Sequence, residues 1–170
     1  MAGCRGYYRR EGALCKEENR REPWFGDFRT WKGAGREVSL AVQMPISELR
    51  GLSVVVDDVV YHPGLETPED APHPFVYFIT VHNRSKCEVV LKGRKWVLRE
   101  DGSGRMRVLE GEGIVGSTPV LRPDDSFSYN SYHTIAADSE ASGAFFGQIP
   151  DGTVVAVRIP PFRMTVPRGV

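Results

Sequence analysis

The sequence predicts an all-β fold made of short antiparallel strands, arranged as a sandwich or a barrel. From Leu52 onward, short runs of β-branched and aromatic residues are separated by turn residues, which is typical of such folds. The 18 glycines and 12 prolines lie outside any low-complexity tract and indicate frequent turns. With 170 residues, 41% of them apolar, the chain has the composition of one globular domain, alone or with an appendage.

The first half of this region contains four expected strands. Residues 52–61 form the first, which ends where His62-Pro63-Gly64 forces a turn. Residues 75–83 are apolar on both faces, as in a central strand covered on two sides. Residues 87–91 and 94–100 follow, and the alternation in the second of these places Trp96 in the core.

The second half adds the remaining strands of an expected total of about seven or eight. The turn Asp101-Gly102-Ser103-Gly104 lets residues 105–109 pair back on the preceding strand. Residues 127–133 alternate as a half-exposed strand does. Further strands are expected at 144–149, 153–159 and 162–166. Pro160-Pro161 denies two adjacent backbone donors to any ladder, so we expect a kink or an edge crossing there, where a strand can change sheets.

Residues 1–43 differ in kind from residues 44–170, which are expected to form the domain. They carry arginine pairs and scattered aromatic residues but no lasting periodicity, and we interpret them as a poorly ordered extension. An alternative is an Arg/Trp-rich arm that folds on RNA. A third is that translation starts at Met44.

Charge and cysteine content narrow the function classes. The 22 basic and 22 acidic residues cancel, which argues against general attraction to nucleic acid or acidic membranes. The longest apolar runs are far shorter than the roughly 20 residues that a helix needs to span a bilayer. Three cysteines without a CxxC pair favour a reducing cytoplasm over a disulfide framework.

A glycine-rich segment, Gly111-Glu112-Gly113-Ile114-Val115-Gly116, matches the GxGxxG pattern of dinucleotide-binding folds. The prolines that follow it exclude the long helix whose N-terminus would hold a pyrophosphate. We favour glycines that allow tight turns. The alternative is a small anion site made by Gly111, Gly113 and Gly116, with Arg107 or Arg122 neutralising the charge of a phosphate, pyrophosphate or nucleotide.

A divalent-cation site is a further candidate, on the acidic loop between two expected strands. Imidazoles would suit Co²⁺ and carboxylates would suit Mg²⁺. No HxH, HxxxH or HxxE spacing supports the site, and solvated loop charges are the interpretation we favour. The candidate ligands are His62, Glu66, Glu69, Asp70 and His73.

We expect no catalysis and no cofactor. No GxSxG elbow is present, and Cys87 at the start of a strand fits a buried apolar side chain. An antiparallel sandwich instead offers edge strands and loops for protein partners. The residue types favoured at such surfaces are Arg94, Arg99, Tyr129 and Tyr132.

Several ordered motifs resemble one known family, the ApaG family or DUF525 domain, over about residues 47–168. They are Arg94 with Trp96, the glycine loop with its trailing Pro119 and Leu121, Phe127-x-Tyr129-x-Ser131, and Ile159-Pro160-x-Phe162. The resemblance implies an immunoglobulin-like or fibronectin type III-like sandwich in which GxGxxG is not a Rossmann feature. It also implies a non-catalytic accessory or protein-interaction domain, associated in bacteria with Co²⁺ and Mg²⁺ homeostasis or efflux and in eukaryotes with protein recognition.

Overall fold

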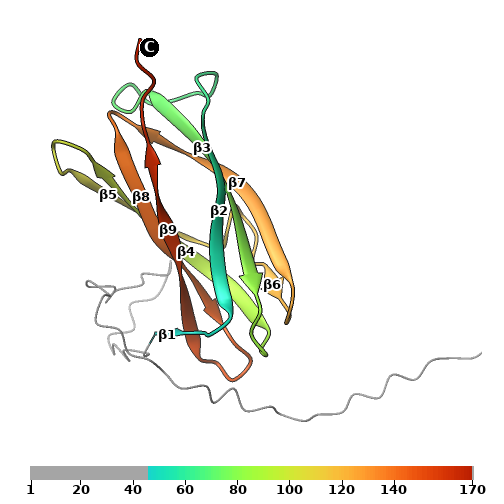
Figure 1. The fold of residues 1–170 in the computed structure, drawn as a ribbon. Coiled ribbons are helices and arrows are strands. Elements are labelled where there is room, and N and C mark those ends of the chain that lie inside the picture. The colour runs from blue at the N-terminus through green and yellow to red at the C-terminus, as the bar shows by residue number, and fades with distance from the viewer. Residues whose placement is uncertain (1–45, 170) are drawn as a thin grey trace, which may run out of the picture.

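The computed structural model describes residues 46–169, so the expectations for residues 1–43 lie outside the described residues. The described part contains nine strands in two facing sheets and no helix (Figure 1). Within it, therefore, no helix is long and apolar enough to cross a membrane. The predicted all-β sandwich is confirmed.

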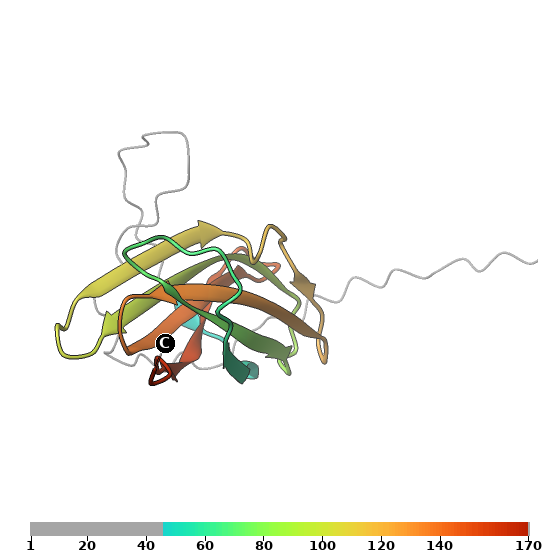
Figure 2. The same cartoon turned by 90° about the horizontal axis from the view of Figure 1, so that it is seen from above.

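The two sheets differ in width (Figure 2). Neighbouring strands are antiparallel except for the short β1–β9 pair, which is parallel. The three-stranded sheet has the order β2 (Leu52–Tyr61), β3 (His73–Asn83) and β7 (Ser126–Ile135). The six-stranded sheet has the order β1 (Ser47–Glu48), β9 (Val154–Met164), β8 (Ser139–Gln148), β4 (Val89–Glu100) and β5 (Met106–Glu112), with β6 (Val120–Leu121) also paired to β4.

Strand β4 joins two segments that the sequence predicts as separate strands. Lys92 and Gly93 look like a turn, but the pairing with β8 shifts register between Leu91 and Gly93 and then continues. Such a bulge inserts a residue without ending the strand. Beyond it, Trp96 is 2% exposed, which confirms its predicted place in the core.

Strand β9 also joins two predicted strands. The ladder with β8 is irregular at Pro160-Pro161, where a kink or an edge crossing is predicted, but the chain does not change sheets there. Ala141 of β8 lies opposite Phe162, and Gly143 lies opposite Ile159. The two prolines therefore share one residue of β8, and the bulge needs no N–H donor from them. The chain stays in the six-stranded sheet.

Asn83 links the two sheets at one end of the sandwich. Its side chain is fully buried, and its Nδ2 donates hydrogen bonds to the carbonyls of Cys87 at 2.8 Å and Leu121 at 2.9 Å. Its Oδ1 accepts a hydrogen bond from the Ser85 hydroxyl at 2.6 Å. The end of β3 is thus tied to the chain entering β4 and to β6.

Replacing Asn83 with alanine removes, at a fully buried position, the hydrogen bonds donated to the Cys87 and Leu121 carbonyls and the acceptor of the Ser85 hydroxyl. We expect Asn83→Ala to lower the free energy of unfolding by about 3 kcal/mol. Urea denaturation measures this loss. The matched control is Asn130→Ala on the exposed face of β7, with an expected loss below about 0.5 kcal/mol. Equal losses in the two variants would contradict the linking role of Asn83.

Candidate functional site

The glycine loop, residues 111–116, is a tight hairpin and not the start of a helix. Ile114 and Ser117 exchange backbone hydrogen bonds of 2.8 and 3.1 Å, and the Gly113 N–H donates to the Lys92 carbonyl at 2.7 Å. Ile114 is fully buried in the core. The amides of Gly113 and Ile114 therefore bond to the backbone and hold an apolar side chain in the sandwich.

Each glycine of the motif has either a steric contact or a positive φ that explains it in this hairpin. A Cβ on Gly111 would lie 3.0 Å from Nη1 of Arg94, whose guanidinium covers this glycine and donates to the Glu112 and Gly113 carbonyls at 3.1 and 3.0 Å. Gly113 has φ +61°, and its Cβ would lie 2.3 Å from the Ser117 carbonyl oxygen. Gly116 has φ +75° but open space around it. The pattern thus has a structural explanation without a ligand.

The two arginines suggested as charge partners of the loop lie apart from each other. Arg122 is 78% exposed, with its Nε 3.8 Å from Oε2 of Glu88. Arg107 stands four residues before Gly111 on β5, about 14 Å along an extended strand. Its Nη2 donates a hydrogen bond to the Thr134 carbonyl of β7. The structure does not gather these side chains around the loop.

The steric difference between two glycines gives a direct test of the hairpin. We expect Gly113→Ala to lower the free energy of unfolding by more than about 3 kcal/mol, because its Cβ meets a backbone oxygen as well as an unfavourable φ. Gly116→Ala, which meets only the φ penalty, should lose about 1 kcal/mol. Chemical denaturation of both variants gives the comparison, and equal losses would contradict this account of the loop.

A group of aromatic rings fills the core behind Arg94. The ring centroid of His133 lies 4.7 Å from that of Tyr77 and 4.8 Å from that of Trp96, and its plane stacks on Phe162. His133 is 5% exposed, and Trp96 Nε1 and His133 Nε2 find no hydrogen-bond partner among the described residues. This group crosses the sandwich, since its members come from both sheets.

Burial sets the protonation of this group. It lowers the pKa of His133 to about 3, with smaller contributions from the positive charges of Arg107 and Arg94. Burial likewise raises the pKa of the Tyr129 hydroxyl, and the neighbouring Tyr77 adds to the rise. Both side chains are therefore neutral near pH 7, and neither is a solvent-accessible acid or base.

The lowered pKa of His133 predicts a loss of stability in mild acid. The unfolded chain binds a proton at His133 below about pH 6.5, whereas the folded chain binds it only near pH 3. The free energy of unfolding should fall by up to about 1.4 kcal/mol per pH unit from pH 6.5 downward. Urea midpoints at pH 7 and 5 should show this loss, His133→Phe should reduce it, and His62→Gln, at an exposed position, should keep it. An unchanged pH dependence in His133→Phe would contradict the assignment.

The four residues suggested as an interaction surface do not form one surface. Arg94 and Tyr129 point toward the interior, where the Tyr129 hydroxyl is buried. Arg99 is exposed on β4 at the position beside Met106, on the outer face of the six-stranded sheet. Tyr132 is 49% exposed on the outer face of the three-stranded sheet. Sequence reasoning selected suitable residue types, but their side chains lie on different faces.

Tyr132 belongs to an exposed apolar row on the three-stranded sheet. The row crosses all three strands, because Val60 pairs with Val76 and Val76 pairs with Tyr132. Val60 is 42% exposed, and Phe78, two residues after Val76 on the same face, is 39% exposed. This outer row is one exposed apolar area of the described residues.

The second exposed apolar area is strand β5, which sequence reasoning did not single out. β5 pairs with β4 alone and forms one edge of its sheet, and six of its seven residues are exposed. Met106, Val108 and Leu109 are 66%, 52% and 38% exposed. The alternation of basic and apolar residues from Arg105 onward was the available signal. Only the sheet order shows that this strand has an open side.

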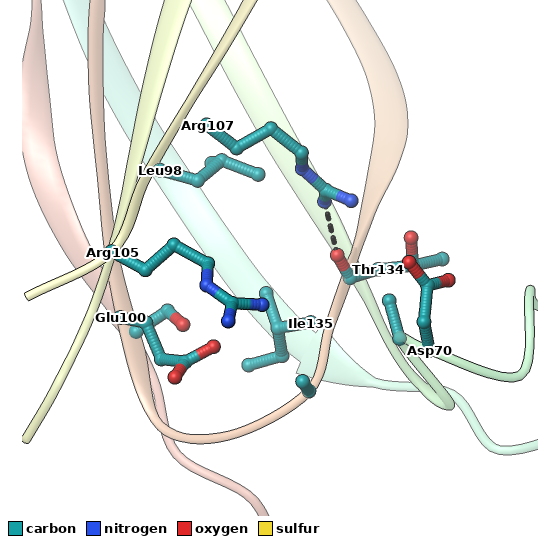
Figure 3. Close-up of a pocket in the computed structure, with 10 residues that line it drawn as sticks. Asp70, Leu98, Glu100, Arg105, Arg107, Thr134 and Ile135 are labelled. Atoms are coloured by element: carbon teal, nitrogen blue, oxygen red, sulfur yellow. Dashed lines mark hydrogen bonds between the residues drawn. The ribbon is translucent and has the colours of Figure 1, made fainter. Parts of the chain in front are cut away.

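A small pocket lies between β5 and β7, with a volume of about 110 Å³ (Figure 3). Arg105 and Arg107 enter it from the β5 side, and Thr134 and Ile135 line it from β7. Asp70 from the β2–β3 loop is also part of the wall. Arg107 and the Thr134 carbonyl thus form a bridge between the edges of the two sheets.

The structure does not bring the five candidate metal ligands together. Among the described residues, no three His, Cys, Asp or Glu side chains converge in a way that could hold a metal ion. Asp70 faces the pocket beside β7, and His73 Nδ1 lies 3.4 Å from the Tyr61 hydroxyl. His62, Glu66 and Glu69 lie at the start and along the course of the intervening loop.

Comparison with known proteins gives a consistent result. Residues 63–148 match the ApaG domain, DUF525. The chain is 32% identical over 102 residues to Protein ApaG of Stenotrophomonas maltophilia, covering 59% of this chain and 80% of that one. It is 34% identical over 115 residues to Protein ApaG of Deinococcus radiodurans, covering 66% and 88%. The crystal structure of the putative ApaA protein from Bordetella pertussis superposes with a TM-score of 0.61 at 25% identity, covering 73% and 99%.

Proposed function

Since the chain belongs to the ApaG domain family, we propose that it is a protein-recognition module that binds an extended segment of its partner along β5, with no catalytic step of its own. One observation carries the proposal. β5 is an edge strand with an open backbone and exposed apolar side chains. Partners add a strand to such an edge in a common mode of peptide recognition.

The register between β4 and β5 defines which backbone groups of β5 are available to bond with a partner strand. The Glu100 N–H donates to the Arg105 carbonyl, and the Gly113 N–H donates to the Lys92 carbonyl. In an antiparallel ladder the bonded residues alternate, so the odd-numbered residues of β5 bond to β4. The N–H and C=O groups of Met106, Val108, Glu110 and Glu112 point to the open side. They offer a partner strand a row of alternating donors and acceptors.

The apolar side chains strengthen this edge as a binding surface. Met106 and Val108 stand side by side on the outer face, and their large exposed fractions give a partner apolar area to bury. Main-chain hydrogen bonds would supply affinity, and the side chains would supply selectivity. A long apolar edge is otherwise prone to uncontrolled pairing.

In this proposal, the family association with Co²⁺ and Mg²⁺ homeostasis or efflux reflects the protein that the module binds. We assign to the module the binding of a protein of such a system along β5, and not the binding of the cation. Peptide binding that requires added Co²⁺ or Mg²⁺ would contradict this assignment.

The proposal is tested with one residue, Val108. Its N–H points away from β4, so Val108→Pro removes a donor from the open edge and leaves the β4 ladder intact. Peptides selected from a random display library on the full chain should bind the Val108→Pro variant at least about tenfold more weakly than the wild type. Val108→Ala, which keeps the N–H, should weaken binding much less. Fluorescence polarisation gives the dissociation constants.

The exposed apolar row of the three-stranded sheet serves as a control for where on the protein the peptides bind. Tyr132→Ser alters the exposed apolar row of the three-stranded sheet and leaves β5 unchanged. We expect it to have no effect on the selected peptides. Binding that persists in Val108→Pro and is lost in Tyr132→Ser would overturn the proposal.

A further inference from the structure

Two arginines, Arg107 of β5 and Arg105 immediately before it, lie on the inner side of this edge strand. Arg107 lies beside Leu98, and Leu109 lies beside Trp96, so the odd-numbered side chains of β5 share the face of the core. Even so, Arg105, Arg107 and Leu109 are all exposed. The three-stranded sheet ends at β7, so no strand of it lies opposite β5, and Arg107 reaches only its edge at the Thr134 carbonyl.

These arginines carry positive charge into the pocket between β5 and β7. Arg105 and Arg107 line it together with Glu100 and Asp70 (Figure 3). Neither guanidinium forms an ion pair with a carboxylate in the part of the chain that the structure describes. Glu100 Oε1 instead accepts a hydrogen bond of 2.7 Å from the Ser103 hydroxyl. Arg107 uses Nη2 on the Thr134 carbonyl, so its other N–H groups and the Arg105 guanidinium remain available to an incoming carboxylate.

The two faces of β5 would impose different chemistry on a strand added beside it. The inward side chains of the added strand would point toward Arg105 and Arg107 at the pocket. The outward side chains of the added strand would lie beside Met106 and Val108, which are 66% and 52% exposed. Successive residues of a strand alternate between these faces. A complementary strand therefore alternates acidic and apolar residues.

A second copy of this chain does not supply that pattern. In a two-fold antiparallel pair of β5 strands, residues opposite each other share a face, so odd-numbered residues meet odd-numbered ones. The carboxylates of β5, Glu110 and Glu112, have even numbers and lie on the face opposite to the arginines. Self-pairing would leave Arg105 and Arg107 without acidic partners. The charges on this edge favour a different protein.

We propose that the partner segment is an extended strand of alternating acidic and apolar residues, with its carboxylates directed at Arg105 and Arg107. This inference rests on the proposed function and specifies the partner's chemistry. Charge-assisted contacts to arginine give the preference for acidic residues, and the apolar contacts with Met106 and Val108 fix which face each residue takes.

The test uses synthetic peptides as long as β5 that alternate valine with glutamate, glutamine or lysine. We expect the glutamate peptide to bind the full chain at least about tenfold more tightly than the glutamine peptide. It should also slow the hydrogen exchange of the Met106, Val108 and Glu110 amides. The preference should shrink as salt is raised. Light scattering of the unliganded protein accompanies the test, and a dimer abolished by Val108→Pro would overturn the inference in favour of self-pairing.

Arg105→Gln is the decisive variant, because this guanidinium holds no other strand in place. It should reduce the preference for glutamate over glutamine to less than about threefold. The matched control, Arg99→Gln, removes the same charge from the outer face and should keep the preference. Equal protection of the β5 amides by all three peptides would overturn the acidic preference and leave the proposed function standing. If display-selected peptides bind β5 and these do not, the inference alone fails; if neither binds β5, both fail.

Discussion

The difference in width between the two sheets underlies the other features of this molecule. A sandwich is stable because each sheet buries its apolar face against the other. Here β2 lies against β9, and β7 lies against β4 through the His133 and Trp96 rings. The three-stranded sheet ends at β7, so it has no strand left to lie opposite β5. β5 therefore extends past the core, bonded to β4 on one side and open on the other.

The boundary between the covered and the uncovered part is built from arginines and glycines. Arg94 lies over Gly111 and bonds to the carbonyls of the glycine hairpin, while Arg107 reaches from β5 to the Thr134 carbonyl of β7. Long side chains of this kind cover apolar surface with their stems and keep the charge near solvent. They also border the aromatic group, which explains why positive charge adds to burial in lowering the pKa of His133. The GxGxxG pattern belongs to this boundary.

The functional proposals follow from the same constraint. A strand outside the shared core keeps its backbone groups and side chains exposed, and these features suit recognition of an extended segment. An added strand would cover the open edge and approach the pocket beside β7.

The sequence by itself determined the all-β class, most strand positions and the core place of Trp96, because alternation and turn residues are local signals. The family followed from the resemblance of its ordered motifs to a known family. It did not reveal the bulges that join the two halves of β4 and of β9, since Lys92-Gly93 and Pro160-Pro161 look like breaks unless the partner strand is known. It also assigned Arg94, Arg99, Tyr129 and Tyr132 to one surface, although their faces depend on register and burial. Only the tertiary structure decided that β5 is an open edge, because exposure of a strand depends on which strands lie beside and opposite it, and no local pattern encodes that.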